Sequence, residues 1–195
     1  TPEDVKYVLS SHYQGTPYDP YASYGDKSQR GMYRSIGINR NDFMALIQIR
    51  PDVPAEQSAI EWVAYASNAF NTMVPFYANV TTTPEYLSCT TKEVSTDSFY
   101  WVSRMIAAMT DASYSKSLIH AERYELGVLS ASRALIHRYD AKLLAEPDAG
   151  QRAALRVEAN EAIAKALKAR AADTLDKVLF ELSSGMKNAF ARSDA

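Results

Sequence analysis

The chain lacks several features that would assign it to a class at once, and each absence excludes one. Its 195 residues include one cysteine, Cys89, which excludes an intramolecular disulfide. No apolar stretch approaches the roughly 18 residues from which a membrane-spanning helix is recognised, so we expect no membrane partner. The net charge is −2 and no basic stripe is present, so we expect no nucleic-acid partner either.

The first residues of the chain are informative about a targeting segment and about a possible N-terminal nucleophile. It opens on Thr1 instead of methionine and shows no recognisable signal peptide, which leaves open a targeting segment in any upstream sequence. With a single cysteine, we expect a reducing, cytoplasmic compartment. A threonine at a chain start can act as a nucleophile with its own α-amine as base. Pro2 and the acids Glu3 and Asp4 instead predict that Thr1 caps a helix.

Two hydrophobic runs, FMALIQI and IEWVAYA, predict buried strands over residues 43–50 and 60–66. In the first run both faces are apolar, with Phe43, Ala45, Ile47 and Ile49 on one face and Met44 and Leu46 on the other. A strand of this kind is covered on both sides, as in the interior of a layered fold. The sequence therefore predicts an α+β fold in which helices from elsewhere in the chain cover the sheet.

Further strands are predicted on either side of these two. Residues 32–38 read as a strand that forms a hairpin with 43–50 through a turn at 39–42. The short connection to 60–66 makes that strand antiparallel, and a short edge strand is expected at 76–80. The strand-rich portion therefore extends over residues 1–96.

After residue 96 the pattern becomes helical. A helix is expected from 97 through 109, a second over 117–144, and an alanine-rich third from Pro147 to about residue 190. Gly185 can interrupt the third helix, because glycine disfavours the helical conformation. We expect residues 97–195 to form a helical region packed on the strand-rich core.

The residues that most often carry chemistry are few and scattered. Cys89 and a histidine could form a thiolate–imidazolium pair, but none of His12, His120 and His137 stands in a recognised local motif. His137 and Asp140 share a helix face, yet two weak ligands do not make a metal site. The sequence therefore predicts no catalytic residue in this chain, no metal and no cofactor.

Candidate substrate-binding residues lie near the strand ends. Arg34, Arg40 and Arg50 flank the predicted hairpin, where an arginine can pair a carboxylate through two hydrogen bonds or simply be a solvated cation. Asn68 and Asn71 follow the strand at 60–66, where amides can line a cleft or close a turn. We take Arg34, Asn68 and Asn71 as the candidates nearest to a substrate.

Three segments, GINRNDFMALIQIRPDVP, EWVAYASNAFNTMVPFYANV and SFYWVSRMIAA, resemble the C-terminal half of the bacterial dipeptidase A family in their order and spacing. The upstream TPEDVKYVLSSHYQGTPYDPY fits as well, and the resemblance extends from residue 1 to about residue 106 before it becomes loose. These proteins are cysteine peptidases of the N-terminal-nucleophile class, similar to penicillin V acylases and bile salt hydrolases. The resemblance implies a four-layer αββα sandwich, of which this chain would be the C-terminal part, with antiparallel strands followed by long helices.

The resemblance also implies a reaction. A mature N-terminal cysteine attacks the peptide carbonyl of a dipeptide, its free α-amine takes the proton, and backbone and asparagine donors hold the oxyanion. The cysteine and most of its partners belong to the first half of such proteins, and the internal Cys89 has no α-amine. We therefore expect a C-terminal fragment that is inactive alone, with the N-terminal half of the same dipeptidase as its partner. A sheet edge left open would also favour a homo-oligomer.

Two other functions remain compatible with the sequence. The chain could be a non-enzymatic module whose alanine-rich helix packs against a partner. It could also be an independent thiol hydrolase that uses Cys89, in which case replacement of Cys89 by alanine would abolish activity.

Overall fold

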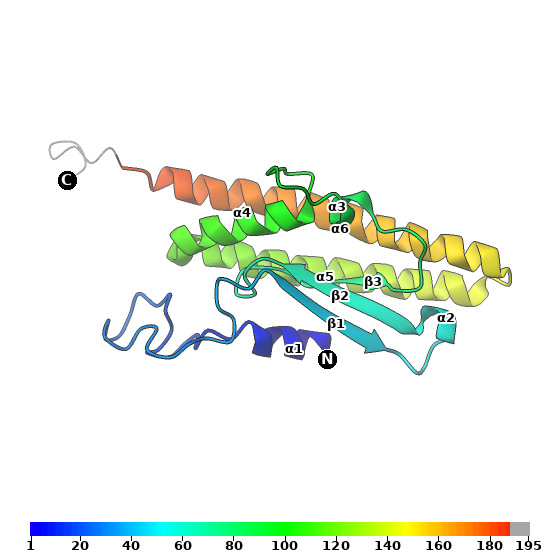
Figure 1. Cartoon of the computed structure of the whole chain (residues 1–195), viewed down its shortest axis with the longest axis horizontal. Coiled ribbons are helices and arrows are strands. Elements are labelled where there is room, and N and C mark those ends of the chain that lie inside the picture. Colours follow the sequence, from blue (N-terminus) through cyan, green and yellow to red (C-terminus); the bar gives the residue numbers. More distant parts are fainter. Residues whose placement is uncertain (188–195) are drawn as a thin grey trace.

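The computed structural model describes residues 1–187, which form a small antiparallel sheet and a set of long helices (Figure 1). The fold class is therefore α+β, as predicted. In chain order the elements are α1 (Pro2–Leu9), β1 (Phe43–Ile49), α2 (Ala55–Ser58), β2 (Ala59–Tyr65), β3 (Val74–Tyr77), α3 (Glu85–Ser88), α4 (Phe99–Ala112), α5 (Tyr114–Ala145) and α6 (Ala149–Ser184).

The helix predicted at the start is confirmed, and Thr1 is its cap. The Thr1 hydroxyl accepts a hydrogen bond from the backbone N–H of Asp4, and the Asp4 carboxylate accepts one from the backbone nitrogen of Thr1, which is a capping box. The α-amine of Thr1 lies 2.8 Å from Asp4 Oδ2, so this amine is engaged by a carboxylate.

The sheet has three strands in the order β1-β2-β3, and both pairs are antiparallel. Phe43 lies opposite Tyr65 and Ile49 opposite Ala59, which confirms the two strands predicted from the hydrophobic runs. The short strand predicted at 76–80 begins earlier, because Val74 already pairs with Val63.

The predicted hairpin between residues 32–38 and 43–50 is wrong, because residues 32–38 form no strand. This segment is bound to the end of α1 instead: the N–H of Gly37 donates to the carbonyl of Ser11 over 2.8 Å. A Cβ at position 37 would lie only 2.4 Å from the carbonyl oxygen of Ser10, so the approach requires glycine. Hydrophobic residues indicated a strand here, but this contact with α1 determines the local conformation.

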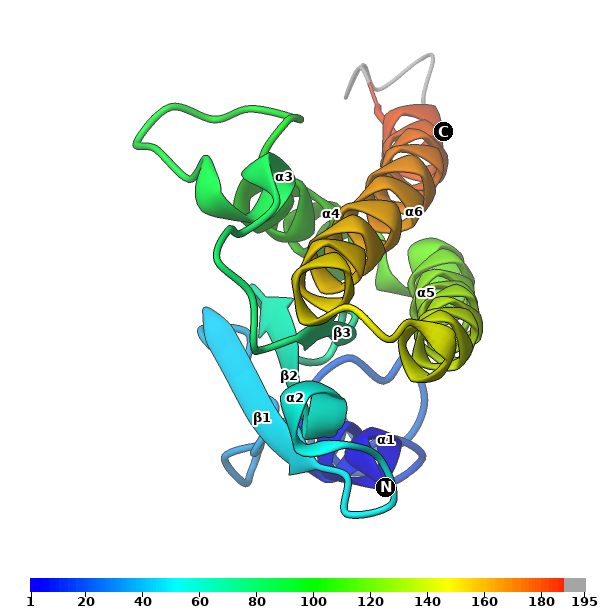
Figure 2. The same cartoon turned by 90° about the vertical axis from the view of Figure 1, so that its right-hand side faces the viewer.

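The three long helices lie where the sequence placed them, with shifted ends. They stack beside β3, and β1 is the strand farthest from them (Figure 2). The last helix ends at Ser184 with Gly185 as its C-terminal cap, so the helix predicted to about residue 190 extends too far. Positions 188–190 of that prediction lie outside the described residues.

Two hydrophobic clusters join sheet and helices, one on each face of the sheet. The first is built around Val63, Val74 and Phe76, on one face of the sheet, with residues of α4, α5 and α6. The second contains Met44, Ile60, Trp62 and Tyr77, on the other face, with residues of α5 and α6. Both clusters draw on the strand-rich and the helical portions of the chain.

Asn160 of α6 closes the outer edge of β3. Its Oδ1 accepts a hydrogen bond from the backbone N–H of Tyr77 over 2.8 Å, and its Nδ2 donates to the Tyr77 carbonyl over 3.0 Å. One amide side chain thus replaces the backbone of a missing neighbouring strand. Asn160 is only 2% exposed, so water is not a ready substitute for either bond.

A polar cluster of Arg50, Tyr77 and Asp140 connects this end of the sheet to α5. Arg50, just after β1, donates to both carboxylate oxygens of Asp140 over 2.6 and 3.0 Å and to the carbonyl of Gln57 over 2.6 Å. The Tyr77 hydroxyl donates to Asp140 Oδ1 over 2.8 Å. Arg50 is therefore occupied structurally, and burial together with Asp140 raises the pKa of Tyr77 above its ordinary value.

The prediction that β1 is covered on both faces is wrong for this chain. Met44 is 5% exposed, but Phe43, Ile47 and Ile49 on the opposite face are 56%, 56% and 65% exposed. The described helices cover the face of Met44 along all of β1, while on the other face they reach only β2 and β3.

We predict that Asn160→Leu lowers the free energy of unfolding by about 2–4 kcal/mol, because it leaves two buried backbone groups of Tyr77 without partners. Chemical denaturation measures the change. Asn79→Leu is the matched control: Asn79 is exposed, and we expect a change within about 0.5 kcal/mol. Equal effects of the two substitutions would contradict the role given to Asn160.

Two buried tyrosines provide a second test, with effects of opposite sign. Tyr77→Phe removes a hydrogen bond to a charged acceptor and should cost about 1.5–3 kcal/mol. The Tyr124 hydroxyl is buried and has no hydrogen-bond partner among residues 1–187, so Tyr124→Phe should be neutral or stabilise by up to about 1 kcal/mol. Thermal unfolding of both variants measures the change in the free energy of unfolding. A loss of stability in Tyr124→Phe would show that the Tyr124 hydroxyl does have a hydrogen-bond partner.

Candidate functional site

The loop between β2 and β3 leaves the sheet through an unusual backbone conformation. Ala66 has a φ of 67°, in the left-handed region that non-glycine residues rarely occupy. Its N–H donates to the carbonyl of Asp42 over 2.9 Å. The Asn71 amide donates to the carbonyls of Tyr65 and Ala66 over 2.9 and 3.0 Å, which holds the turn closed. Strain of this kind persists where the surroundings over-determine the conformation.

A buried lysine fixes the same loop from below. Lys6 of α1 is 2% exposed, and its Nζ donates to the carbonyl of Asn68 and to Ser10 Oγ, each over 2.7 Å. Glu125 Oε1 of α5 lies 3.6 Å from the same nitrogen. Burial lowers the pKa of Lys6, while the charge of Glu125 opposes that shift. The ammonium thereby connects α1, α5 and the loop.

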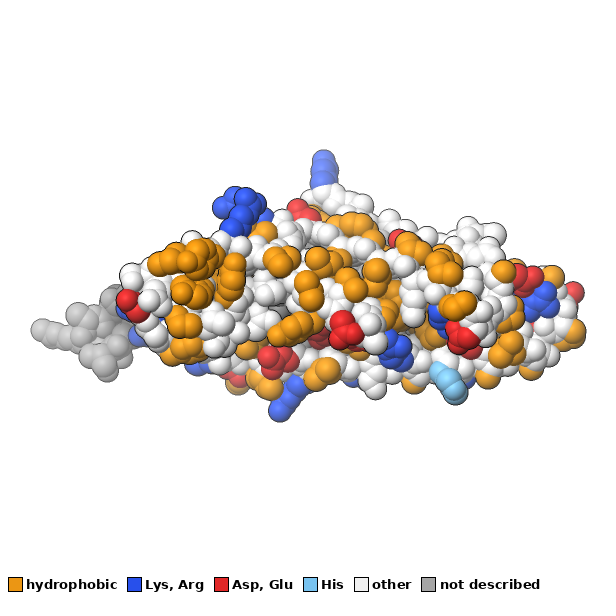
Figure 3. All heavy atoms as spheres, turned by 90° about the horizontal axis from the view of Figure 1, so that it is seen from below, with side chains coloured by type: hydrophobic (Ala, Val, Ile, Leu, Met, Phe, Trp, Pro, Cys, Tyr) orange, Lys and Arg blue, Asp and Glu red, His pale blue; other side chains and the backbone are white. Residues whose placement is uncertain are grey.

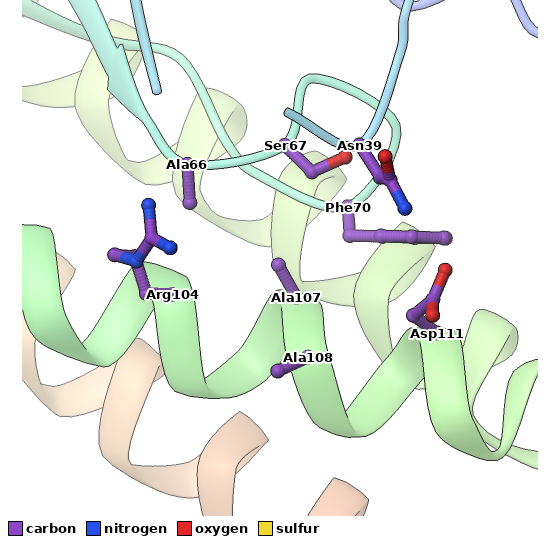
Figure 4. Close-up of a pocket in the computed structure, with 8 residues that line it drawn as sticks. All are labelled: Asn39, Ala66, Ser67, Phe70, Arg104, Ala107, Ala108 and Asp111. Atoms are coloured by element: carbon purple, nitrogen blue, oxygen red, sulfur yellow. The ribbon is translucent and has the colours of Figure 1, made fainter. Parts of the chain in front are cut away.

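A cavity of about 220 Å³ lies between this loop and α4. Figure 4 shows the arrangement: Ala107 and Ala108 of α4 lie on one side, and Ala66, Ser67 and Phe70 lie opposite. The lining residues are Asn39, Ala66, Ser67, Phe70, Arg104, Ala107, Ala108 and Asp111. Four of the eight carry polar side chains, in a space that fits a small molecule.

Opposite charges stand at the two ends of the cavity. Arg104 and Asp111 both project from α4 toward the loop, Arg104 at one end and Asp111 at the other (Figure 4). The Arg104 Nη1 group donates to the Asp42 carboxylate, which orients the guanidinium. Near Asp111, burial together with the Asp111 charge raises the pKa of Tyr21 to about 12, so this phenol stays neutral.

Ser67 adds an unsatisfied polar group to the cavity. The residue is 4% exposed, and its Oγ has no hydrogen-bond partner in the part of the chain that the structure describes. A buried hydroxyl left unpaired is costly, and such groups in native proteins call for an explanation. The site therefore offers a cation, an anion and a free hydroxyl within one cavity.

None of the predicted substrate-binding residues Arg34, Asn68 and Asn71 lines this cavity, although Asn68 and Asn71 belong to the loop beside it. Asn68 and Asn71 are buried, and their amides donate to backbone carbonyls. Their neighbours Ser67 and Phe70 line the cavity instead. Arg34 is exposed, in the segment that follows α1 without regular structure, and is not among the lining residues.

Sequence reasoning missed the contribution of α4. The signal was present: Arg104, Ala107, Ala108 and Asp111 recur at helical spacing, so two small residues separate two opposite charges on one helix face. Lys6 was missed because a lysine in an amphipathic helix is normally solvated, and its burial depends on contacts far along the sequence.

The remaining candidates are structural in character. The Cys89 thiol donates to the carbonyl of Asp97 over 3.1 Å, and the cavity beside it is lined by no histidine. Within residues 1–187 there is no group of three or more histidine, cysteine, aspartate or glutamate side chains placed to hold a metal ion. None of the helices in these residues is both long enough and apolar enough to cross a membrane.

Comparison with known proteins agrees with the resemblance to the dipeptidase A family. Residues 1–127 match the model of peptidase family C69. A protein named dipeptidase from Bifidobacterium longum is 40% identical over 231 aligned positions, which cover 100% of this chain and 43% of that protein. A probable dipeptidase A of Streptococcus pyogenes is 43% identical over 194 positions, covering 100% of this chain and 40% of its own length. Dipeptidase A of Lactobacillus helveticus is 46% identical over 112 positions, or 57% of this chain and 23% of that protein.

The chain thus spans about two fifths of the length of the curated relatives that it matches in full, and it corresponds to a C-terminal region of them. The family match covers residues 1–127, and identity to the relatives is 40–43% across the whole chain. These findings show that the chain belongs to peptidase family C69.

Proposed function

We propose that this chain is the C-terminal part of a dipeptidase, a hydrolase of dipeptide amide bonds whose nucleophile is an N-terminal cysteine in an upstream part. The names of the relatives support the reaction. The observation that carries the proposal is the uncovered side of β1, in a chain that spans two fifths of those relatives.

The uncovered side of β1 presents both backbone and side chains. The residues that flank β1 bond to those that flank β2: the carbonyl of Asp42 accepts from the N–H of Ala66, and the N–H of Arg50 donates to the carbonyl of Ser58. Because an antiparallel ladder alternates, the N–H and C=O groups of Phe43, Ala45, Ile47 and Ile49 point to the open edge. Side chains of the same four residues form the uncovered face, and Figure 3 shows hydrophobic patches on the side of the molecule where this edge lies.

Such an edge is a template for another strand, and natural proteins protect it. The upstream part of the enzyme is the occupant that we propose, since most of the length of the relatives lies outside this chain. Its sheet would cover the apolar face of β1 and complete the αββα sandwich implied by the resemblance. A second copy of this chain is the alternative occupant, and it would make a homo-oligomer.

In this proposal the chemistry is shared between the two parts. The upstream cysteine attacks the carbonyl carbon of the dipeptide, and its α-amine accepts the thiol proton. The C–N bond breaks as the amine of the second residue leaves with that proton, and a thioester to the first residue remains. Water then hydrolyses the thioester, which releases the first residue as a free acid and regenerates the thiol. This chain supplies the cavity between α4 and the β2–β3 loop, into which the substrate reaches. Asn68 and Asn71 keep that loop in place, and Arg34 stays a candidate contact.

The arrangement of α6 favours this function over a non-enzymatic interaction module. The apolar stripe of α6 is buried against the rest of the chain, at Ala159, Ile163, Leu167, Ala171 and Val178. On α6 the exposed large hydrophobic residues are Leu179 and Phe180, near its C-terminal end, whereas on β1 they lie along the open edge of a sheet.

We predict that this chain alone does not hydrolyse dipeptides, and that activity appears when the separately produced upstream part is added. Ile47→Lys should abolish this gain of hydrolytic activity, because it places a charge on the face that the upstream part covers. Ile119→Lys on α5, where Ile119 is 45% exposed, is the matched control and should leave the gain intact. Release of free amino acids from a dipeptide measures activity.

Light scattering of the same mixtures separates the two occupants of β1. A heterodimer that Ile47→Lys prevents supports the upstream part, whereas a homodimer that Ile47→Lys dissolves would overturn it in favour of a second copy. Hydrolysis by this chain alone would overturn the shared active site.

We predict that Cys89→Ala leaves the hydrolysis rate of the reconstituted enzyme unchanged. The Cys89 thiol donates to a backbone carbonyl and lacks the α-amine that would take its proton. Single-turnover rates and thiol labelling of both parts measure this; loss of activity with an intact fold would return Cys89 to the role of nucleophile.

A further inference from the structure

We propose that the cavity between α4 and the β2–β3 loop binds a free dipeptide as a zwitterion, with its carboxylate at Arg104 and its ammonium group at Asp111. The inference rests on the proposed dipeptidase function, which it deepens by stating how the two ends of the substrate are recognised. It also explains how one site would select peptides of two residues.

The spacing of the two charges fits a dipeptide. Arg104 and Asp111 are seven positions apart on α4, which corresponds to about 10.5 Å along the helix axis. Two extended residues span about 7 Å, and a charge-assisted hydrogen bond of about 2.8 Å at each end brings the distance between the two charged groups of the protein to about 12.6 Å. The backbone rise from position 104 to position 111 is about 2 Å shorter than this, a difference that the long arginine side chain can bridge. A third residue would lengthen the ligand by about 3.5 Å. The pair of charges therefore acts as a measure of peptide length.

The space between the charges is open. Ala107 and Ala108 are the α4 residues that line the cavity between Arg104 and Asp111, and their methyl groups leave room for a peptide above the helix (Figure 4). Phe70 lies opposite and is 2% exposed, so it forms a fixed apolar wall. Larger side chains at positions 107 and 108 would fill this space.

Both charged groups are available to a ligand. The Arg104 side chain is 43% exposed, and among the described residues its Nη1 alone donates hydrogen bonds, to Asp42 and Tyr100. Asp42 thus orients the guanidinium while Nε and Nη2 remain for a carboxylate. Asp111 is exposed and forms no ion pair with any side chain of residues 1–187.

Ser67 gives an independent reason to expect a ligand here. The residue lines the cavity, and its buried hydroxyl has no partner in the described chain. The peptide unit at the centre of a dipeptide carries both an N–H and a carbonyl oxygen, and either satisfies a hydroxyl. The zwitterion thus offers partners to three of the four polar side chains that line the cavity, those of Arg104, Asp111 and Ser67.

The test is equilibrium binding to this chain, followed by NMR at millimolar ligand, with three ligands of the same sequence: a free dipeptide, its N-acetyl form and its C-terminal amide. Acetylation removes the charge that Asp111 recognises, and amidation removes the charge that Arg104 recognises. For the unmodified chain we expect each modification to weaken binding by about tenfold or more.

Two substitutions assign each loss of affinity, that from acetylation and that from amidation, to one residue of the cavity. In Asp111→Asn the penalty for acetylation should disappear while the penalty for amidation remains, and in Arg104→Gln the reverse should hold. Exposed residues elsewhere serve as controls, so Asp176→Asn and Arg123→Gln should retain both penalties. Arg104→Lys, which keeps the charge, should retain part of the preference for a free carboxylate.

Several results would overturn the proposal. These are equal binding of all three ligands, equal loss of both penalties in each variant, or no shift of the Ala107 and Ser67 resonances at millimolar dipeptide. Because no bond is broken in this experiment, its outcome is independent of hydrolysis. If the reconstituted enzyme fails to cleave dipeptides while the binding pattern holds, the proposed function fails and the site stands.

Discussion

The fold depends on one amide side chain at the boundary between sheet and helices. Asn160 pairs with both backbone groups of Tyr77, so α6 takes the place of a fourth strand at the edge of β3. A small sheet depends on a packed hydrophobic face or on helices for its stability, and in the described chain a helix side chain covers the edge of β3. Hydrophobic contact between α6 and β3 has no direction of its own, whereas two hydrogen bonds to one residue fix the register. The position of α6, and with it α5 and α4, follows from this pairing.

Closing one edge leaves the sheet asymmetric. Toward β3 the sheet is paired, buried and packed by three helices, while toward β1 the described chain leaves the backbone open and one face uncovered. Single exposed hydrophobic residues, such as Leu126 and Leu144 on α5, are ordinary at a protein surface. On β1, in contrast, Phe43, Ile47 and Ile49 share one face beside an unpaired backbone edge. An unpaired edge beside an uncovered apolar face is expected where a neighbouring strand or sheet of the fold belongs to another part of the protein. This agrees with a chain that covers two fifths of the length of its relatives.

Local patterns in the sequence were sufficient for the elements whose contacts are local or repetitive. The capping box of Thr1, the two central strands and the three long helices were predicted because propensity, capping and periodicity agree there. The failures occurred where a tertiary contact decides. Residues 32–38 look like a strand, yet the close approach of Gly37 to Ser10 binds them to α1. The amides of Asn68 and Asn71 suggested a cleft, yet they hold the backbone that forms its wall. No sequence pattern reveals which of two adjacent polar residues faces inward at a left-handed turn.

The candidate site is therefore a product of constraints that lie outside it. The ammonium of Lys6 holds the carbonyl of Asn68, Asn71 holds the strained turn at Ala66, and the loop so fixed faces a stretch of α4 with small residues between opposite charges. Burying an ammonium group costs stability unless its partners are held in place, and here the partners belong to α1, α5 and the loop. Packing of the hydrophobic core does not require a buried ammonium group here, because an aliphatic side chain at position 6 would fill the same space. A site that must hold one loop wall at a fixed distance from one helix does require it, since directional bonds position a backbone more closely than apolar contacts do. The polar groups buried around the loop are thus better explained by the geometry of the cavity than by the stability of the fold.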